Sequence, residues 1–428
     1  AVNDAPIASV SYNPFYANLG PPGGKTPPVV LDATSSSDAN GDPLSYAWSL
    51  TATPGGVAVS LSGATTANPS FVPPVEGEYL LTVVVSDPVA FGRGAASSAP
   101  LQVAVRVGRH VLALSHEVTA VAYAKGADKV VMVGRDPNGY VPTQKLWVLD
   151  PIAGTETAGV ELVAPPVALA VSPDGRTAVV SFDANYLPRV QEVNLQTGAA
   201  ATAQSLREYD AEMAWSSRSR VYYFQPYYPQ NAFGDAIHVL DLTIRDDYMA
   251  ACSGCDLYGA RGTRGRTDVT GTTLLVLNAN EKELDAYAIS ADASLTRKAA
   301  ATGEASVDLW TSPDGGWLVL SSGAVYRYLA ASGTLTKAAA TIPGAPLLHA
   351  DAHAMGAAVA LSGDGGALSR FDLTASGTPS TGQDALPIFG VDGYGAQTHG
   401  QYAFLSADGT RRFVLTLCAY GWGLVSYP

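Results

Sequence analysis

The sequence predicts an all-β protein in which an immunoglobulin-like β-sandwich is followed by a seven-bladed β-propeller. One hairpin motif recurs three times in the later part, and short strands separated by Gly, Pro and Ser turns fill the first hundred or so residues. The 428 residues include 43 Gly and 28 Pro, and only 15% are charged. This composition provides enough apolar residues for a large core, and its many Gly and Pro residues disfavour long helices.

The repeated hairpin consists of a strand, a tight turn and a second strand. Its three copies are Val-Ser-Pro-Asp-Gly-Arg-Thr-Ala-Val-Val-Ser at 171–181, Thr-Ser-Pro-Asp-Gly-Gly-Trp-Leu-Val-Leu-Ser at 311–321 and Leu-Ser-Ala-Asp-Gly-Thr-Arg-Arg-Phe-Val-Leu at 405–415. Asp-Gly supplies the positive φ of a hairpin turn, and the flanking Val, Leu, Phe and Trp suit a half-buried strand.

A second signature, hydrophobic-Asp/Asn-hydrophobic, closes several predicted strands at Asp150, Asn194, Asp241 and Asp372. The first three lie roughly 40 to 50 residues apart, which is the period of one four-stranded propeller blade. We therefore expect seven blades within residues 109–428, with inner strands near Val118, Val167, Ala211, Arg264, Val307, Leu347 and Gln401. The strand at 109–114 should complete the last blade and so close the ring.

Residues 1–108 form the predicted sandwich, with strands at 29–32, 44–50, 70–72, 79–85 and 101–105. Trp48 lies on an alternating strand and should fill the centre of the sandwich. The motifs Asn-Asp-Ala-Pro-Ile-Ala at 3–8, Leu-Asp-Ala-Thr-Ser-Ser-Ser-Asp-Ala-Asn-Gly-Asp-Pro-Leu-Ser-Tyr-Ala-Trp at 31–48, Pro-Val-Glu-Gly-Glu-Tyr at 74–79 and Val-Val-Val-Ser-Asp at 83–87 resemble a polycystic-kidney-disease (PKD) domain, in this order.

The resemblance implies a calcium site, because some PKD domains bind calcium at the loop that corresponds to 38–42. Carried over to this chain, the implied ligands are Asp38, Asp42, Asn3, Asp4 and Asp87. Oxygen donors gathered on a bend suit a hard cation. The alternative is a turn whose Asp and Asn side chains cap their own backbone.

The propeller part resembles the YVTN-type repeats of bacterial and archaeal surface proteins, in which a strand ends in Asp-x-x-x-x-Gly-Thr. Asp-Pro-Ile-Ala-Gly-Thr at 150–155 is a near copy, one residue shorter. The resemblance implies an extracellular, cell-surface or periplasmic location. The sequence begins without a signal pattern, so we expect any targeting segment to have been removed.

The net charge and the lengths of the apolar runs limit the kinds of partner that we expect. The formal net charge is −13 and the pI is near 4.8, which disfavours nucleic acid and anionic membranes as partners, and no apolar run is long enough for a membrane helix.

We expect a small loop disulfide between Cys252 and Cys255 and a buried thiol at Cys418. Half a zinc site and a thioredoxin-like motif are weaker alternatives.

The predicted inner strands bring charged residues to the channel. Aligned on the turns, they place Glu212, Arg264, Asp308 and His349 at one ring position, and Arg266 and Asp351 two residues further on. The period of two in a strand also puts His349, Asp351 and His353 on one face, which would suit a transition metal. Inter-blade ion pairs are the favoured alternative, with Arg264 or Arg266 balancing Asp308 and Asp351.

Two exposed aromatic residues, Tyr227 and Tyr228, lie in a Pro-flanked loop that could contact a sugar or a protein. The sequence shows no nucleophile elbow, phosphate loop or catalytic carboxylate pair. We therefore expect a non-catalytic exported or cell-surface adhesion protein that binds a protein or glycan. The alternatives are a metal-assisted hydrolase or lactonase acting in the channel, and a structural surface-layer element.

Overall fold

The computed structural model describes residues 3–11, 15–19, 26, 28–87, 94–137, 143–184, 187–206, 212–216, 219–224, 237–254, 264–279, 282–303, 305–363, 367–374, 380–385, 399–418 and 421–427. These residues form strands and two short 3-10 helices. The chain divides into two compact units. The first contains Ala1–Leu112, Asp384–Pro387 and Val425–Pro428, and the second contains Ala113–Gln383 and Ile388–Leu424.

The first unit is a β-sandwich built on the strands β3, β5 and β7. Its elements are β1 (Phe15–Leu19), β2 (Val29–Val30), β3 (Ser45–Ala52), η1 (Pro54–Gly56), β4 (Ser70–Phe71), β5 (Gly77–Asp87), β6 (Ala96–Ser97) and β7 (Leu101–Leu114). Along β5, every second side chain is buried, as the alternating sequence requires. Trp48 is 6% exposed within the core, and its indole N–H donates to the Thr66 carbonyl at 3.1 Å. The predicted sandwich and the place of Trp48 are confirmed.

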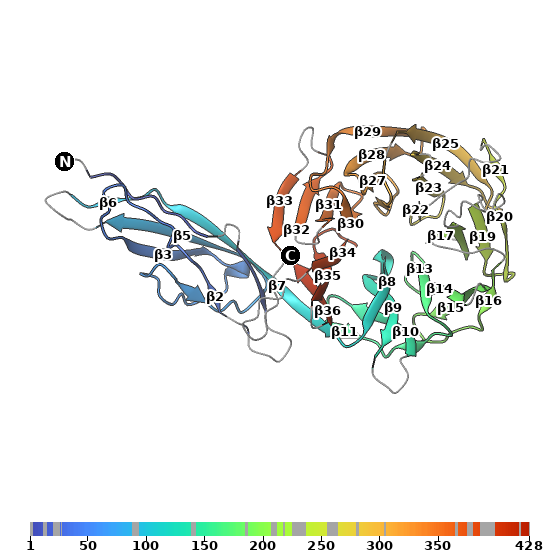
Figure 1. Cartoon of the computed structure of the whole chain (residues 1–428), viewed down its shortest axis with the longest axis horizontal. Helices are drawn as coiled ribbons and strands as arrows, with labels where there is room; N and C mark the ends of the chain where they lie inside the picture. Colours follow the sequence, from blue (N-terminus) through green and yellow to red (C-terminus); the bar gives the residue numbers. More distant parts are fainter. Residues whose placement is uncertain are drawn as a thin grey trace. The chain divides into compact units, whose positions relative to one another are not determined.

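The second unit is a β-propeller, and Figure 1 shows its sheets arranged in a ring. The described residues form seven propeller sheets, as the sequence predicted. The first contains β8 (Glu117–Ala124), β9 (Lys129–Asp136), β10 (Thr143–Asp150), β11 (Thr155–Glu156) and β12 (Val160–Glu161), with η2 (Lys125–Ala127) after β8. The second contains β13 (Pro166–Val171), β14 (Thr177–Ala184), β15 (Leu187–Asn194) and β16 (Gln204–Ser205). The third contains β17 (Glu212–Ser216), β18 (Arg220–Phe224), β19 (Ile237–Asp241) and β20 (Asp246–Met249).

The remaining sheets follow the same order of strands from the inside outwards. The fourth contains β22 (Arg264–Thr267), β23 (Thr273–Asn278), β24 (Glu283–Ile289), β25 (Leu295–Thr302) and β21 (Cys252–Ser253). The fifth contains β26 (Leu309–Thr311), β27 (Trp317–Leu320), β28 (Ala324–Leu329) and β29 (Thr334–Thr341). The sixth contains β30 (Leu347–Ala352), β31 (Ala357–Ser362), β32 (Ala367–Asp372) and β33 (Ser380–Ala385). The seventh contains β34 (His399–Leu405), β35 (Arg412–Cys418) and β36 (Gly421–Tyr427).

The last sheet takes its remaining strand from the start of the propeller sequence. Its strand order runs β7-β36-β35-β34, so β7 and β36 are neighbours although they lie about 300 residues apart. The prediction that residues 109–114 complete the last blade is therefore confirmed.

The three Asp-Gly turns have one construction. Gly175, Gly315 and Gly409 have φ of 69°, 67° and 72°, values at which an L side chain is strained. In each turn, a serine hydroxyl donates to the aspartate and accepts the N–H of the strand that follows, with the pairs Ser172–Asp174, Ser312–Asp314 and Ser406–Asp408. The Ser and Asp of the repeated sequence therefore fix the turn between the first two strands of these blades.

Cys252, at the start of β21, is disulfide-bonded, and its partner lies outside the described side chains. The predicted pairing with Cys255 stays a prediction. Among the described residues, no helix has the length and apolar composition needed to cross a membrane.

Candidate functional site

The inner strands of the propeller surround a cavity of about 270 Å³. Figure 1 shows β8, β13, β22, β30 and β34 at the inner side of the ring. Both predicted ring positions contribute to the cavity lining, through Glu212 and His349 at the first and Arg266 and Asp351 at the second, and Trp310 lines the cavity beside them. Period-two alternation in the inner strands explains why residues two apart both face the channel.

Two arginines of β22 neutralise two carboxylates from the neighbouring blades. Arg266 forms a close ion pair with Glu212 of β17, and its other nitrogen lies 3.6 Å from Asp308. Arg264 lies 3.8 Å from Glu212 and 3.4 Å from Asp308. Between 20% and 32% of each side chain remains exposed. For Glu212 and Asp308, the structure thus has the ion pairs that the sequence favoured.

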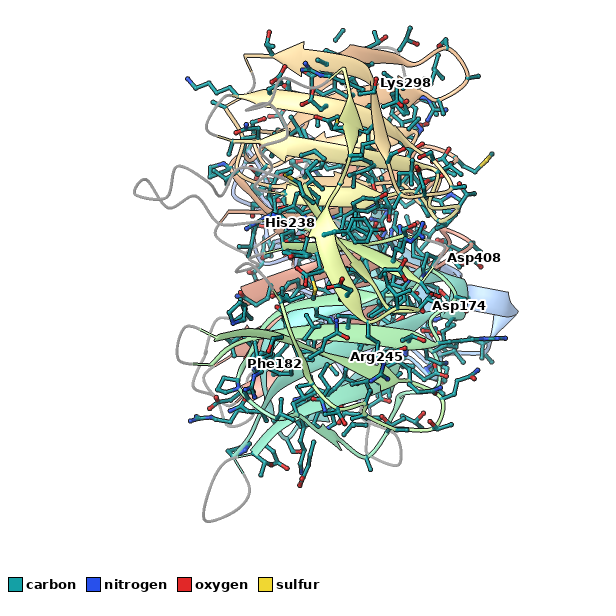
Figure 2. All side chains as sticks on the ribbon, turned by 90° about the vertical axis from the view of Figure 1, so that its right-hand side faces the viewer. Asp174, Phe182, His238, Arg245, Lys298 and Asp408 are labelled. Carbon is teal, nitrogen blue, oxygen red and sulfur yellow. The ribbon has the colours of Figure 1, made fainter. Side chains whose placement is uncertain are left out.

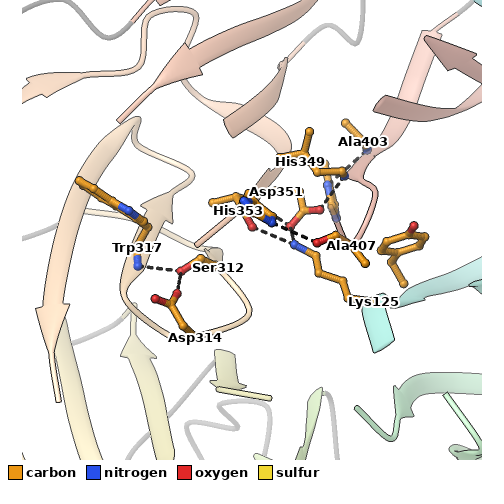
Figure 3. Close-up of polar contacts among 12 residues, drawn as sticks. Lys125, Ser312, Asp314, Trp317, His349, Asp351, His353, Ala403 and Ala407 are labelled. Carbon is orange, nitrogen blue, oxygen red and sulfur yellow. Dashed lines mark hydrogen bonds and ion pairs between the residues drawn. The ribbon is translucent and has the colours of Figure 1, made fainter. Parts of the chain in front are cut away.

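Asp351 pairs with a different cation from the one predicted. Its Oδ1 accepts a hydrogen bond of 2.6 Å from Lys125, which also donates to the Ala352 carbonyl at 2.8 Å (Figure 3). Its Oδ2 accepts the N–H of Leu405 at 2.8 Å. The expectation that Arg264 or Arg266 balances Asp351 is wrong, because Lys125 reaches it from the end of the first inner strand. This interaction links the first blade to the sixth.

His349 is held as a neutral imidazole. Its Nδ1 accepts the N–H of Ala403 at 3.3 Å, so the proton of the neutral ring resides on Nε2. The pKa of His349 is lowered to about 4, chiefly by burial; the charge of Asp308 opposes this shift and that of Arg266 contributes to it. The ring centroid lies 5.2 to 5.4 Å from those of Trp310, Tyr402 and Phe404. These aromatic contacts explain the burial.

His353 does not share the channel face with His349 and Asp351. β30 ends at Ala352, so the period of two stops before this residue. His353 instead caps a turn: its Nδ1 accepts the N–H of Met355 at 3.2 Å, and its Nε2 donates to the Ala407 carbonyl at 3.0 Å. The predicted set of two histidines and one aspartate on a single face is wrong.

Aromatic side chains complete the cavity wall. Trp215, Trp310, Tyr123 and Phe404 all line it, and Tyr123 stacks on Phe404 with a centroid distance of 5.3 Å. Burial raises the pKa of Tyr123, and its hydroxyl donates to Asp128, so it stays protonated. Within the described part of the channel, the carboxylates have partners and no serine, cysteine or lysine is placed as an activated nucleophile.

The cavity continues into a wider groove of about 590 Å³ at the ends of the inner strands. Pro173, Pro313, Trp215 and Val269 line both spaces, and Val269 is 43% exposed. The groove lies at the Ser/Asp turns, and Figure 2 places Asp174 and Asp408, from two of these turns, on the same side of the propeller. This groove is the channel mouth, and apolar side chains therefore line it beside the polar turns.

A second candidate site lies in the sandwich. Asp38, Asp42 and Asp87 each offer a carboxylate oxygen, and these three atoms lie within 4.8 Å of one another. Asp42 and Asp87 are buried, at 7% and 1% exposed. The Asp38 Oδ1 accepts the N–H groups of Asn40 and Asp42, so the turn-capping alternative also describes part of this loop.

Asn3 joins this acidic cluster and Asp4 does not. The Asn3 amide donates to the Asp87 Oδ2 at 2.9 Å, whereas Asp4 contacts the exposed side of the loop through Asn40. Asn3 Oδ1 and Asp38 Oδ2 are buried oxygens without a hydrogen-bond partner. Unpaired buried oxygens beside clustered carboxylates fit a hard cation such as calcium, with Asn3, Asp38, Asp42 and Asp87 as its ligands. Asp4 lies outside this set.

Tyr227 and Tyr228 lie outside the described residues, so the predicted aromatic loop stays a prediction. The channel lining also includes residues that the sequence did not indicate, among them Tyr123, Lys125, Trp215 and Asp268. Lys125 follows an unremarkable Tyr-Ala pair, and only its position at the end of an inner strand could have placed it near the channel.

Comparisons with known proteins agree with this architecture. Residues 25–105 match a family of PKD domains, so the chain contains a PKD-like domain. No curated protein sequence matched the chain.

Solved structures with a similar fold include β-propellers. One is the β-propeller domain of Cps50 (Swd1) from Myceliophteria thermophila, with a TM-score of 0.54, 12% identity, and coverage of 74% of this chain and 97% of that one. A chain of a mitotic checkpoint complex gives a TM-score of 0.51 at 12% identity, covering 74% and 91%. A chain of Kuenenia stuttgartiensis hydrazine synthase gives 0.50 at 12% identity, covering 71% and 94%. At such low identity, these likenesses show the fold alone.

Proposed function

We propose that this protein is a non-catalytic, exported or cell-surface binding protein. Its propeller binds a protein or glycan, and its PKD-like domain acts as a spacer and adhesion module. Both folds suit interaction modules, although a fold by itself does not define a function. The solved structures named above include a protein assembly, which agrees with a role in binding.

The observation that carries this proposal is the neutralisation of the channel carboxylates. Glu212 and Asp308 contact two arginines, and Asp351 contacts Lys125. A cationic side chain beside each carboxylate repels a metal ion, and a saturated carboxylate is a poor general base. The described part of the channel thus presents a surface for binding and no side chain that is activated for catalysis.

The alternative function, a metal-assisted hydrolase or lactonase, would need the channel carboxylates and His349 to converge on an ion. The arginines contact both Glu212 and Asp308, so this alternative has less support. A purely structural surface-layer role would not account for the open groove at the channel mouth.

One feature supports an extracellular, cell-surface or periplasmic location. Cys252 is disulfide-bonded, and disulfides persist in oxidising compartments. The net charge of −13 also agrees with the expectation that the partner is neither nucleic acid nor an anionic membrane. We also propose that the repeats of the propeller are of the YVTN type.

We also propose that the PKD-like domain binds one calcium ion at Asp38, Asp42, Asp87 and Asn3. The support is the short distance between the three carboxylates together with the unpaired oxygens of Asn3 and Asp38. A bound cation would offset the repulsion among the carboxylates and thereby stabilise the sandwich.

The function is tested with the purified full chain and with the cells that produce it. Fractionation should place the chain outside the cytoplasm, and the chain should bind an extracellular protein or glycan while leaving ester and lactone substrates unchanged. Hydrolysis that depends on a metal and disappears in His349→Ala would contradict the proposal, as would a purely cytoplasmic location.

A further inference from the structure

The propeller cavity has three N–H donors that no described residue accepts. The Nε2 of His349 carries the proton, because its Nδ1 accepts the Ala403 N–H, and this ring lines the cavity. Trp215 and Trp310 also line the cavity, and no described residue accepts a hydrogen bond from either indole N–H. Donors that face a narrow cavity need an acceptor, so these groups favour a ligand that supplies acceptor oxygens.

The charges of the cavity disfavour an ionic ligand. The described lining contains two cations, Lys125 and Arg266, and three carboxylates, Glu212, Asp268 and Asp351. Lys125 pairs with Asp351 and Arg266 pairs with Glu212. An anion would meet a small net negative charge, and a cation would meet unpaired donors.

Asp268 is also satisfied without a ligand. Its Oδ1 accepts the N–H groups of Thr272 and Thr273, each at 2.8 Å, and its Oδ2 accepts the hydroxyl groups of Thr270 and Thr272. The remaining lining is mostly apolar and includes the aromatic residues Trp215, Trp310 and Phe404. Aromatic walls and a few placed donors are typical of a pocket for a small molecule with both apolar and polar sides.

We propose that this cavity binds one neutral sugar residue, with His349, Trp215 and Trp310 donating to its oxygens and the aromatic walls packing against its C–H face. A sugar combines several acceptor oxygens with an apolar face and carries no charge. The cavity of about 270 Å³ is near the small end of ligand pockets and suits one ring, while the groove leads outward for the rest of a glycan. This inference rests on the proposed binding function and narrows its ligand to glycan.

The neutrality of His349 predicts how binding depends on pH. Its pKa is lowered to about 4, so the imidazole keeps one N–H donor and no charge between about pH 5 and pH 8. We expect sugar affinity to be constant over this range.

The experiment titrates the full chain with six neutral sugars, glucose, galactose, mannose, N-acetylglucosamine, N-acetylgalactosamine and fucose, and with the charged N-acetylneuraminic acid and glucosamine, each up to about 50 mM. Tryptophan fluorescence reports binding, because Trp215 and Trp310 line the cavity. At least one neutral sugar should bind. His349→Phe should weaken it about tenfold, since one hydrogen bond is lost, and His349→Gln should retain most of the affinity because it keeps a donor.

Trp215→Phe should weaken binding, because phenylalanine keeps the aromatic ring and lacks the donor. The matched control is Trp317→Phe, because Trp317 packs beneath Arg327 and does not belong to the cavity lining. Thermal melting of each variant verifies that it is folded.

Three results would overturn the inference: no sugar of the panel binds, only N-acetylneuraminic acid or protonated glucosamine binds, or His349→Phe and Trp215→Phe bind as tightly as the parent chain. An extracellular protein partner that binds in the absence of any sugar affinity would contradict the glycan inference alone and leave the proposed binding function standing.

Discussion

Replacing Glu212 with alanine should destabilise the propeller, because Arg264 and Arg266 would each lose a carboxylate. Of the two carboxylates that pair with them, Asp308 would remain beside both guanidinium groups, at 3.4 and 3.6 Å. Breaking a fully buried ion pair costs about 3 to 5 kcal/mol, and breaking an exposed pair costs about 0 to 1 kcal/mol. The Glu212 side chain is 20% exposed and Arg266 is 28% exposed, so we expect about 2 to 3 kcal/mol.

The assay is urea unfolding of the full chain followed by tryptophan fluorescence. Glu212→Ala should lower the midpoint, and Glu212→Gln should lower it less because the amide still accepts hydrogen bonds. The matched control is Glu117→Ala, which breaks an ion pair with Arg135 whose side chains are 53% and 46% exposed. If Glu212→Ala were no more destabilising than Glu117→Ala, the account of a structural ion-pair network would be refuted.

Other predictions concern the same two units. Because the pKa of His349 is lowered to about 4, the unfolded chain takes up this proton first, so stability is lost as pH falls from about 6.5 to 4, by roughly 2 to 3 kcal/mol. A wild-type acid profile identical to that of His349→Phe would disprove this. Calcium should raise the melting temperature of the full chain relative to a chelator, Asp87→Asn should abolish the effect, and Asp4→Ala should preserve it. Equal melting with calcium and chelator would contradict the proposed site. Deleting residues 109–114 should open the last blade and broaden the unfolding transition of the propeller, whereas a deletion variant that melts like the parent would contradict the strand order β7-β36.

The repeats of this chain were predictable because they are local. The Asp-Gly turns at 174–175, 314–315 and 408–409 have the positive φ that the sequence required, and the inner strands follow at blade spacing. The strand predicted near Val307 begins at Leu309, so this boundary differs from the prediction by two residues.

Contacts between blades were less predictable. Lys125 and Asp351 are 226 residues apart and meet only because the ring closes, which no local pattern encodes. His353 does not lie on the channel face, contrary to the prediction, because β30 ends one residue before it, at Ala352. In the sandwich, the family resemblance located the acidic cluster, but the choice between Asn3 and Asp4 depended on which side of the loop each side chain reached.

Metal analysis of the purified full chain distinguishes most sharply between a neutralised binding cavity and a metal-dependent catalytic site in the propeller channel. We expect no stoichiometric transition metal, in the wild type or in Glu212→Gln and His349→Ala, and at most calcium that disappears in Asp87→Asn. An equimolar transition metal that is lost on replacing Glu212 or His349 would contradict this expectation.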